Sequence, residues 1–180
     1  MTAGAAIPII VMGVSGAGKT TVGELLARAL GRPFIDADDL HDAEMKRQMA
    51  RGVPLSDADR APWLDRVGRA IAGAGPAAPV IACSALKRAY RDRIRDHAPG
   101  VAFVELAGAP EVILGRLRSR THAYMPPELL DSQFETLESL ASDETGLRVD
   151  IGRSAPDELV RRIRAWAQGE RPAATAQLRA

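Results

Sequence analysis

IIVMGVSGAGKT, residues 9–20, specifies more of the structure than any other segment. Its last eight residues match GxxxxGK[ST] and lie between the apolar run IPIIVM (7–12) and the helix-forming TVGELLARAL (21–30). A strand, a glycine-rich turn and a helix N-terminus in this order bind phosphate, because glycine allows backbone N–H groups to approach phosphate oxygens closely. We expect nucleotide phosphates to contact nine residues: Gly13, Val14, Ser15, Gly16, Ala17, Gly18, Lys19, Thr20 and Thr21.

Two side chains of this loop have predicted chemical roles. Lys19 is one of only three lysines, and its compact ammonium group is suited to bridge the β- and γ-phosphates of ATP during catalysis. The hydroxyl of Thr20 is suited to bind Mg²⁺. The sequence therefore predicts ATP and Mg²⁺ as cofactors.

Composition limits the remaining possibilities. The 180 residues suffice for one domain, and 24 basic residues nearly balance 23 acidic ones, which gives no general electrostatic case for nucleic acid or a membrane surface as partner. We find no leader pattern at the N-terminus and no run of 18 apolar residues. A single cysteine, Cys83, excludes an internal disulfide and favours a reducing compartment, so we expect a cytoplasmic protein.

Short apolar runs alternate with longer segments of helical period, which predicts a doubly wound α/β fold with a five-stranded parallel sheet. The expected strands are 7–12, 33–36, 79–83, 101–106 and 147–151. The expected helices are 19–30, 42–51, 57–74, 86–97, 110–119, 127–137 and 156–168. We expect one domain over 1–168, with a helical substrate-binding insertion at about 39–76, a lid at about 116–140 and a loose tail at 169–180. Both insertions should border a ligand site at the carboxyl ends of the strands.

The third expected strand ends in Cys83-Ser84 and has no acid for a magnesium ion. Acids follow the second strand instead, in FIDADDL (34–40). In an extended segment Asp36 and Asp38 share one side, where one could serve the metal and the other could orient the attacking hydroxyl and accept its proton. We assign Asp36 to the metal and Asp38 to catalysis, although the residues leave that division open, and a solvated acidic turn is the alternative.

The acceptor side is expected in LHDAEMKRQMARGVPLSDADRAPWL (40–64) and CSALKRAYRDRIR (83–95). Arg60 can clamp a carboxylate or hydroxyls, and His41 is a weaker candidate contact. Ser84 is the expected N-cap of the following helix, which places Lys87 in the first turn, where the helix dipole disfavours a cation and a bound anion would explain it. Arg91 lies one turn further on, and both cations could point into the cleft.

The segment GRLRSRTHAYMPPELLDSQFETLE (115–138) has the features of a lid. Arg116 and Arg120 are four residues apart, before the Pro126-Pro127 break, and could act together on the transferring phosphoryl group while excluding water. The alternative is a solvated helix end.

Together, MGVSGAGKTTVG, DADDLHD, MARGVPLSDADRAPWL, ACSALKRAYRDRIR and MPPELLDSQFETLE resemble the P-loop gluconokinases, with order and spacing preserved over about residues 9–151. The resemblance implies a nucleoside-monophosphate-kinase fold, similar to shikimate kinase, and transfer of the γ-phosphoryl of ATP to the C6 hydroxyl of D-gluconate. It also implies a homodimer. The residues it implies are Asp38 near the acceptor hydroxyl, Arg116 and Arg120 at the lid, and His41, Arg60, Lys87 and Arg91 around the acceptor.

The chain departs from that family's pattern at two places. His122-Ala123-Tyr124 stands where Gly-His-Phe is usual, and Ala37 and Asp39 stand where glycine and an apolar residue are common. Two alternatives remain open at this point: a kinase of shikimate or another aldonate, and a nucleotide-binding module without turnover.

Overall fold

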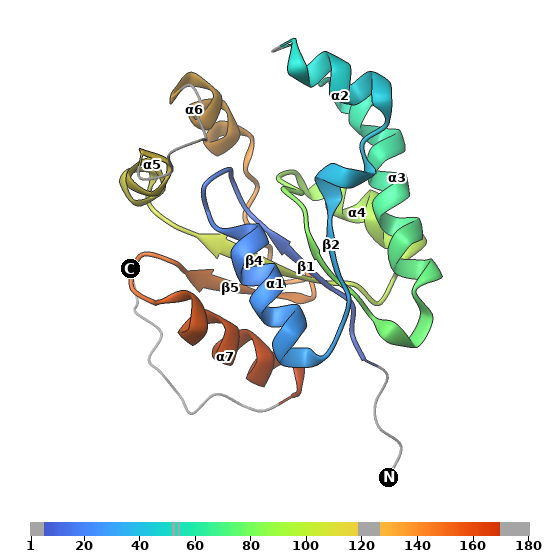
Figure 1. Cartoon of the computed structure of the whole chain (residues 1–180), viewed down its shortest axis with the longest axis vertical. Helices are drawn as coiled ribbons and strands as arrows, with labels where there is room; N and C mark the ends of the chain where they lie inside the picture. The colour runs from blue at the N-terminus through green and yellow to red at the C-terminus, as the bar shows by residue number, and fades with distance from the viewer. Residues whose placement is uncertain (1–5, 52, 54, 119–126, 170–180) are drawn as a thin grey trace.

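The computed structural model describes residues 6–51, 53, 55–118 and 127–169. Its centre is a five-stranded parallel sheet in the order β2-β3-β1-β4-β5 (Figure 1). The strands are β1 Ile9–Met12, β2 Phe34–Asp36, β3 Val80–Ala82, β4 Ala102–Ala107 and β5 Gly146–Asp150. This arrangement confirms the predicted parallel sheet.

Helices cover both faces of the sheet. The helices are α1 Lys19–Leu30, α2 Ala43–Ala50, α3 Asp57–Gly73, α4 Arg88–His97, α5 Pro110–Arg118, α6 Pro127–Thr136 and α7 Pro156–Ala167. Helix α1 packs beside α7, and α3 packs beside α4 (Figure 1). Among the described residues, no helix combines the length and apolar character needed to cross a bilayer.

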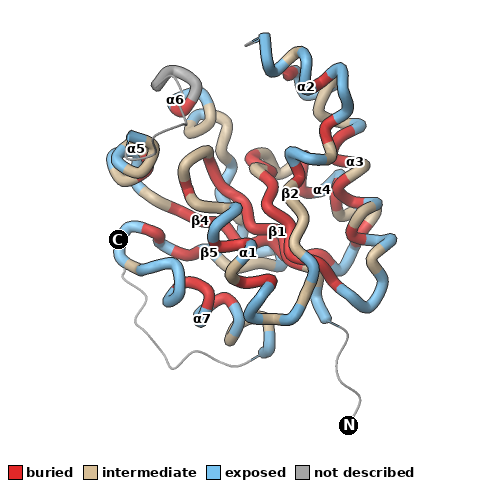
Figure 2. Tube along the Cα trace, viewed as in Figure 1, coloured by how far each residue is buried: buried red, intermediate tan, exposed pale blue. Residues whose placement is uncertain are grey.

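The core is divided by the sheet, because alternate residues of a strand face opposite sides. In β1, Ile9 and Val11 join the cluster that includes α1 and α7, while Ile10 and Met12 join the cluster that includes α3 and α4. All four residues are fully buried, and Figure 2 shows the central strands as buried between partly exposed helices. Burial on both faces explains why this strand is continuously apolar instead of alternating.

The phosphate loop lies at one end of the sheet, between two projecting groups of helices. Figure 1 shows α5 and α6 on one side of this end and α2 on the other. Helix α2 comes from the expected acceptor-binding insertion and α6 from the expected lid, whereas α5 overlaps the expected lid only at its last residues. The exact limits of those segments, and of a domain over 1–168, stay predictions, and residues 170–180 of the expected tail lie outside the described residues.

Two local expectations were wrong. Residues Ala37–Leu40 form a 3-10 helix, η1, instead of continuing as extended chain, because the Asp36 side chain accepts a hydrogen bond from the Asp38 N–H. Asp36 and Asp38 therefore do not share one side of a strand. Helix α4 begins at Arg88 with Lys87 as N-cap, not at Leu86 behind a Ser84 cap, because the chain turns at Ala85 with a φ of 43°.

Candidate active site

The phosphate loop has the conformation that its glycines permit. Gly16 and Gly18 have φ angles of 83° and 98°, which favour glycine. Gly18 is the N-cap of α1 and has no side chain with which to cap the first turn. The N–H groups of that turn and the helix dipole together form an anion-binding end.

The nine residues predicted to contact ATP divide into two groups. Four do not line the cavity described below: the buried loop residues Gly13, Val14 and Ala17, and Thr21, which is exposed on the first turn of α1. The other five line a cavity at the end of the sheet: Ser15, Gly16, Gly18, Lys19 and Thr20. The Lys19 ammonium lies 3.1 Å from the Val14 carbonyl oxygen, so the side chain folds back over the loop.

Thr20 and Asp36 meet at the carboxyl end of the sheet. The Thr20 hydroxyl donates to Asp36 Oδ2 at 3.1 Å, although the two residues lie on different elements, α1 and β2. The described residues contain no group of three or more histidine, cysteine or acidic side chains able to hold a metal ion. A hydroxyl next to one carboxylate fits Mg²⁺, which keeps several waters and takes its other ligands from phosphate oxygens.

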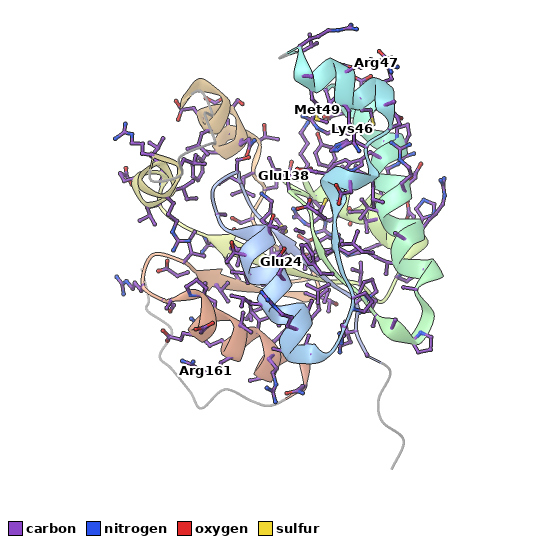
Figure 3. The ribbon with its side chains drawn as sticks, in the orientation of Figure 1. Glu24, Lys46, Arg47, Met49, Glu138 and Arg161 are labelled. Atoms are coloured by element: carbon purple, nitrogen blue, oxygen red, sulfur yellow. The ribbon has the colours of Figure 1, made fainter. Side chains whose placement is uncertain are left out.

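A cavity of about 510 Å³ joins the phosphate loop to the acceptor segment. Predicted residues that line it besides the loop are Asp36, Asp38, His41 and Arg60. Apolar walls come from Met49, Val53 and Leu55, and Figure 3 shows Met49 on the side of α2 that faces α6. The cavity is thus shared by the donor loop and the acceptor segment.

Asp38 lies on the 3-10 helix η1, and its side chain is 86% exposed. Buried His41 stacks on Trp63 with ring centroids 4.4 Å apart, and its Nδ1 lies 3.1 Å from the Asp38 carbonyl oxygen. The Trp63 indole N–H donates to the Ala37 carbonyl at 2.7 Å. Burial lowers the pKa of His41, so the imidazole is neutral at pH 7. His41 and Trp63 therefore support the turn that carries Asp38.

A cluster of charged groups forms around Asp57, at the start of α3. Lys87 donates to one carboxylate oxygen at 2.6 Å, and the Tyr90 hydroxyl donates to the other. Arg60 lies 3.6 Å from Asp57 and donates to the Tyr90 oxygen at 3.3 Å. The hydrogen bond from Lys87, followed by that from Tyr90, holds the pKa of Asp57 below its usual value. The same bond raises the pKa of Lys87, so the pair is ionised at neutral pH.

The comparisons with known proteins agree with this geometry. A family model described as shikimate kinase matches residues 15–168. The chain is 45% identical to a probable gluconokinase of Mus musculus, over 83% of this chain and 91% of that one. It is 46% identical to the thermosensitive gluconokinase of Escherichia coli K12, over 79% and 78% respectively. The chain belongs to the gluconokinase family.

Solved structures place this gluconokinase-family protein in the same group. A gluconokinase from Sinorhizobium meliloti superposes with a TM-score of 0.82 at 44% identity, covering 92% of this chain and 93% of that one. A shikimate kinase from Acinetobacter baumannii has a TM-score of 0.57 at 20% identity, which shows a shared fold. As a member of this family of P-loop kinases, the protein is an ATP-dependent kinase.

The structure corrects the predicted position of Arg91 in this gluconokinase-family protein. Its side chain is fully buried, and it pairs with Glu144, also buried, through two hydrogen bonds of 2.7 Å. One guanidinium nitrogen also donates to the carbonyls of Ala85, Leu86 and Glu138. These contacts turn Arg91 away from the cleft, so the expectation that it faces the cavity with Lys87 was wrong.

Lys87 does not line the cavity directly, and its partner is Asp57. The expectation of a first-turn cation next to a bound anion was therefore wrong in its geometry. The anion at the start of α4 is instead a side chain of the protein: the Glu138 carboxylate accepts the Arg88 N–H at 2.6 Å. This contact satisfies one donor of the helix N-terminus.

Of the two predicted lid arginines, the structure describes Arg116. Its guanidinium lies beside the phosphate loop, 3.4 Å from the Ala17 carbonyl oxygen and 2.7 Å from that of Ile151. Arg120 and the displaced His122 lie outside the described residues.

Sequence reasoning missed three residues of the site. Asp57 stands where an ordinary acidic residue in the first turn of a helix is common, although its i, i+3 spacing from Arg60 could have indicated a pair. No sequence pattern marked Tyr90 as a site residue. Gln133 of α6 lines the cavity and accepts a hydrogen bond from the phosphate loop, a contact between residues 118 positions apart that no local pattern predicts. Cys83 also lines the cavity, and burial raises the pKa of its thiol to about 12.

Proposed function

We propose that this protein transfers the γ-phosphoryl group of ATP to the C6 hydroxyl of D-gluconate, giving 6-phospho-D-gluconate and ADP. The observation that carries the proposal is the single cavity shared by the phosphate loop, the Thr20–Asp36 pair, Asp38 and Arg60. The gluconokinases among the relatives support the choice of acceptor.

On the donor side, backbone N–H groups of the loop hold the phosphates, and Lys19 neutralises charge on the β- and γ-phosphates. Thr20 and Asp36 would hold Mg²⁺, which supplies further neutralisation of the phosphate charge. Arg116 lies beside the loop, where its guanidinium can stabilise charge on the phosphates as transfer proceeds. Phosphoryl transfer depends mainly on such positioning and charge.

On the acceptor side, gluconate has a carboxylate at one end and the reacting hydroxyl at the other. Arg60 would bind the carboxylate from the cavity wall. Lys87, which does not line the cavity, would join it by exchanging its Asp57 partner for the substrate, and the neutral His41 would contact hydroxyls. Asp57 holds the two cations in place, with Arg60 at 3.6 Å and Lys87 at 2.6 Å from its carboxylate oxygens. Asp38 would then orient the C6 hydroxyl toward the γ-phosphate and accept its proton.

The test is a coupled assay with ATP, Mg²⁺ and a panel of sugar acids that includes gluconate, other aldonates and shikimate. We expect turnover on gluconate. Turnover on a different acceptor, with none on gluconate, would refute the substrate assignment. The absence of turnover on any acceptor would favour a nucleotide-binding module.

Asp38→Asn tests the catalytic assignment. We expect kcat to fall by about a hundredfold, the contribution typical of a general base, with ATP affinity largely kept. Asp39→Asn is the matched control, because it removes an adjacent exposed carboxylate that lies beside Asp38 but does not line the cavity shared by Lys19 and Arg60. Equal activity of both variants and the wild type would remove Asp38 from the mechanism.

A cytoplasmic homodimer is part of the same proposal. The resemblance to gluconokinases implies the dimer, and the single cysteine supports a reducing compartment. Sedimentation velocity tests the oligomeric state, since a monomer at micromolar concentration would contradict it.

A further inference from the structure

Gln133 of α6 reaches the phosphate loop. Its Oε1 accepts the backbone N–H of Ser15 at 2.7 Å, and its Nε2 lies 3.4 Å from the Ser15 hydroxyl oxygen. Two other N–H groups of the loop, those of Gly13 and Ala17, donate to backbone carbonyls of Ser84 and Val14. The Ser15 N–H therefore differs from these two, because its acceptor is a side chain that can move.

The Gln133 oxygen accepts the Ser15 N–H in a loop whose N–H groups are expected to bind phosphate oxygens. Ser15 lies in the first half of the loop, before the residues at the start of α1, and it lines the cavity together with Asp38 and Arg60. The start of α1 is expected to hold the β-phosphate. We therefore expect the Ser15 N–H to face the terminal phosphoryl group, on the acceptor side of the β-phosphate.

The position of Gln133 is set by packing on both sides along α6. Leu130 is buried in the core, and Phe134 and Leu137 pack against the same cluster. Beyond the helix, the Glu138 N–H donates to the Leu86 carbonyl at 2.8 Å, which ties the end of α6 to the start of α4. Figure 3 labels Glu138 at this junction.

A carboxamide can serve two states of such a site. Its oxygen accepts from an N–H group when no phosphate is bound, and its NH₂ group donates to a phosphate oxygen when one is. A carboxylate can perform only the first role, and it repels phosphate. A thioether of the same length performs neither role well.

We propose that Gln133 contacts the γ-phosphate of bound ATP. In the structure its oxygen accepts a hydrogen bond from the Ser15 N–H. When ATP binds, that N–H donates to the γ-phosphate, and the Gln133 NH₂ group donates to the same phosphate. The residue then helps to hold the group that is transferred. This inference rests on the proposed kinase reaction, but it does not depend on which acceptor is used.

The experiment compares two nucleotides that differ in the γ-phosphate. Binding of Mg²⁺-ADP and of Mg²⁺-adenylyl imidodiphosphate is measured by calorimetric titration for the wild type, Gln133→Glu and Gln133→Met. For Gln133→Glu we expect the ATP analogue to bind about tenfold more weakly and ADP to stay within about twofold, because only the γ-phosphate meets the new charge. For Gln133→Met we expect ADP affinity likewise kept, and kcat, measured in the coupled assay, to fall about tenfold.

Glu135→Gln is the matched control, since it changes a charge at an exposed position of the same helix. We expect it to leave both nucleotide affinities and kcat unchanged. If Gln133→Glu weakens the analogue and ADP equally, or weakens neither, Gln133 only packs α6 against the loop and the inference is overturned. A wild-type protein that binds neither nucleotide would instead refute the proposed kinase function, so the two failures are distinguishable.

Discussion

Charged residues near this site are held in place by other side chains of the protein, which a bound substrate would have to replace or share as partners. Lys87 is the clearest case, because it donates to Asp57 at 2.6 Å and lies 5.5 Å from the centre of the Tyr90 ring. The arrangement keeps the ammonium group charged and in place without a ligand. Arg60 shares the same two neighbours, so the two cations converge on one point.

Lys87→Met should therefore weaken binding of the acceptor. We expect the KM for gluconate to rise at least about tenfold, since a charge-assisted hydrogen bond to the carboxylate is lost, while ATP affinity stays unchanged. Steady-state kinetics with each substrate varied in turn measures both effects. Lys46→Met is the control, because Lys46 is an exposed lysine of α2 that contacts the Asp39 carbonyl. An unchanged KM in Lys87→Met would exclude Lys87 from the acceptor site.

At the scale of elements, the sequence predicts the positions of helices and strands better than the side-chain contacts between them. The five strands and seven α-helices of the described residues were all predicted, because apolar periodicity is a local signal, as is a capping pair such as Ser56 and Asp59. The start of α4 was misplaced because it depends on Glu138, fifty residues further along the chain. Arg91 was misassigned because its partner Glu144 lies 53 positions further along the chain. Helical periodicity alone cannot show whether an arginine faces a cleft or a buried carboxylate.

Arg91 and Glu144 make the junction between α4 and the segment before β5 sensitive to acid. Hydrogen bonds from Arg91, and then from Arg95, lower the pKa of Glu144 to about 2, whereas the ordinary value is 4.5. The carboxylate therefore stabilises the fold fully above about pH 4.5, and this contribution is lost as the pH falls toward about 2.

Glu144→Gln should lower the free energy of unfolding at pH 7 by about 3 kcal/mol, since it leaves the buried Arg91 without its counter-charge. Urea denaturation at pH 7 and pH 3 measures the change, and we expect a smaller difference between variant and wild type at pH 3. Asp143→Asn, next to it in the chain but exposed, should have a much smaller effect. Equal effects of the two substitutions would contradict a structural role of the buried pair.

At the scale of the whole molecule, the order β2-β3-β1-β4-β5 brings three separate segments to one end of the sheet. In the proposed reaction, the loop after β1 would hold phosphate, Asp36 at the end of β2 and Asp38 just after it would hold the metal and orient the acceptor hydroxyl, and the turn after β3 leads to Lys87. A ligand that spans these loops stabilises the folded state, because the unfolded chain cannot bind it.

Saturating Mg²⁺-ATP should therefore raise the melting temperature. At a hundred times Kd the added stability is about 2.7 kcal/mol, which corresponds to a rise of about 5–10 °C for a chain of this size. Differential scanning fluorimetry measures it. Lys19→Met should abolish most of the rise while leaving the unliganded melting temperature within a few degrees of the wild type. A full rise in that variant would refute the role of Lys19 in nucleotide binding.

Cys83 gives the protein a practical property of a different kind. The only thiol of the chain is buried, and with a pKa of about 12 it forms almost no thiolate at neutral pH. The protein should therefore be inert to maleimides and iodoacetamide as it stands. A cysteine introduced on the exposed side of α2 or α6 would be the one reactive group, so a fluorescent dye could be attached there without first removing the native residue.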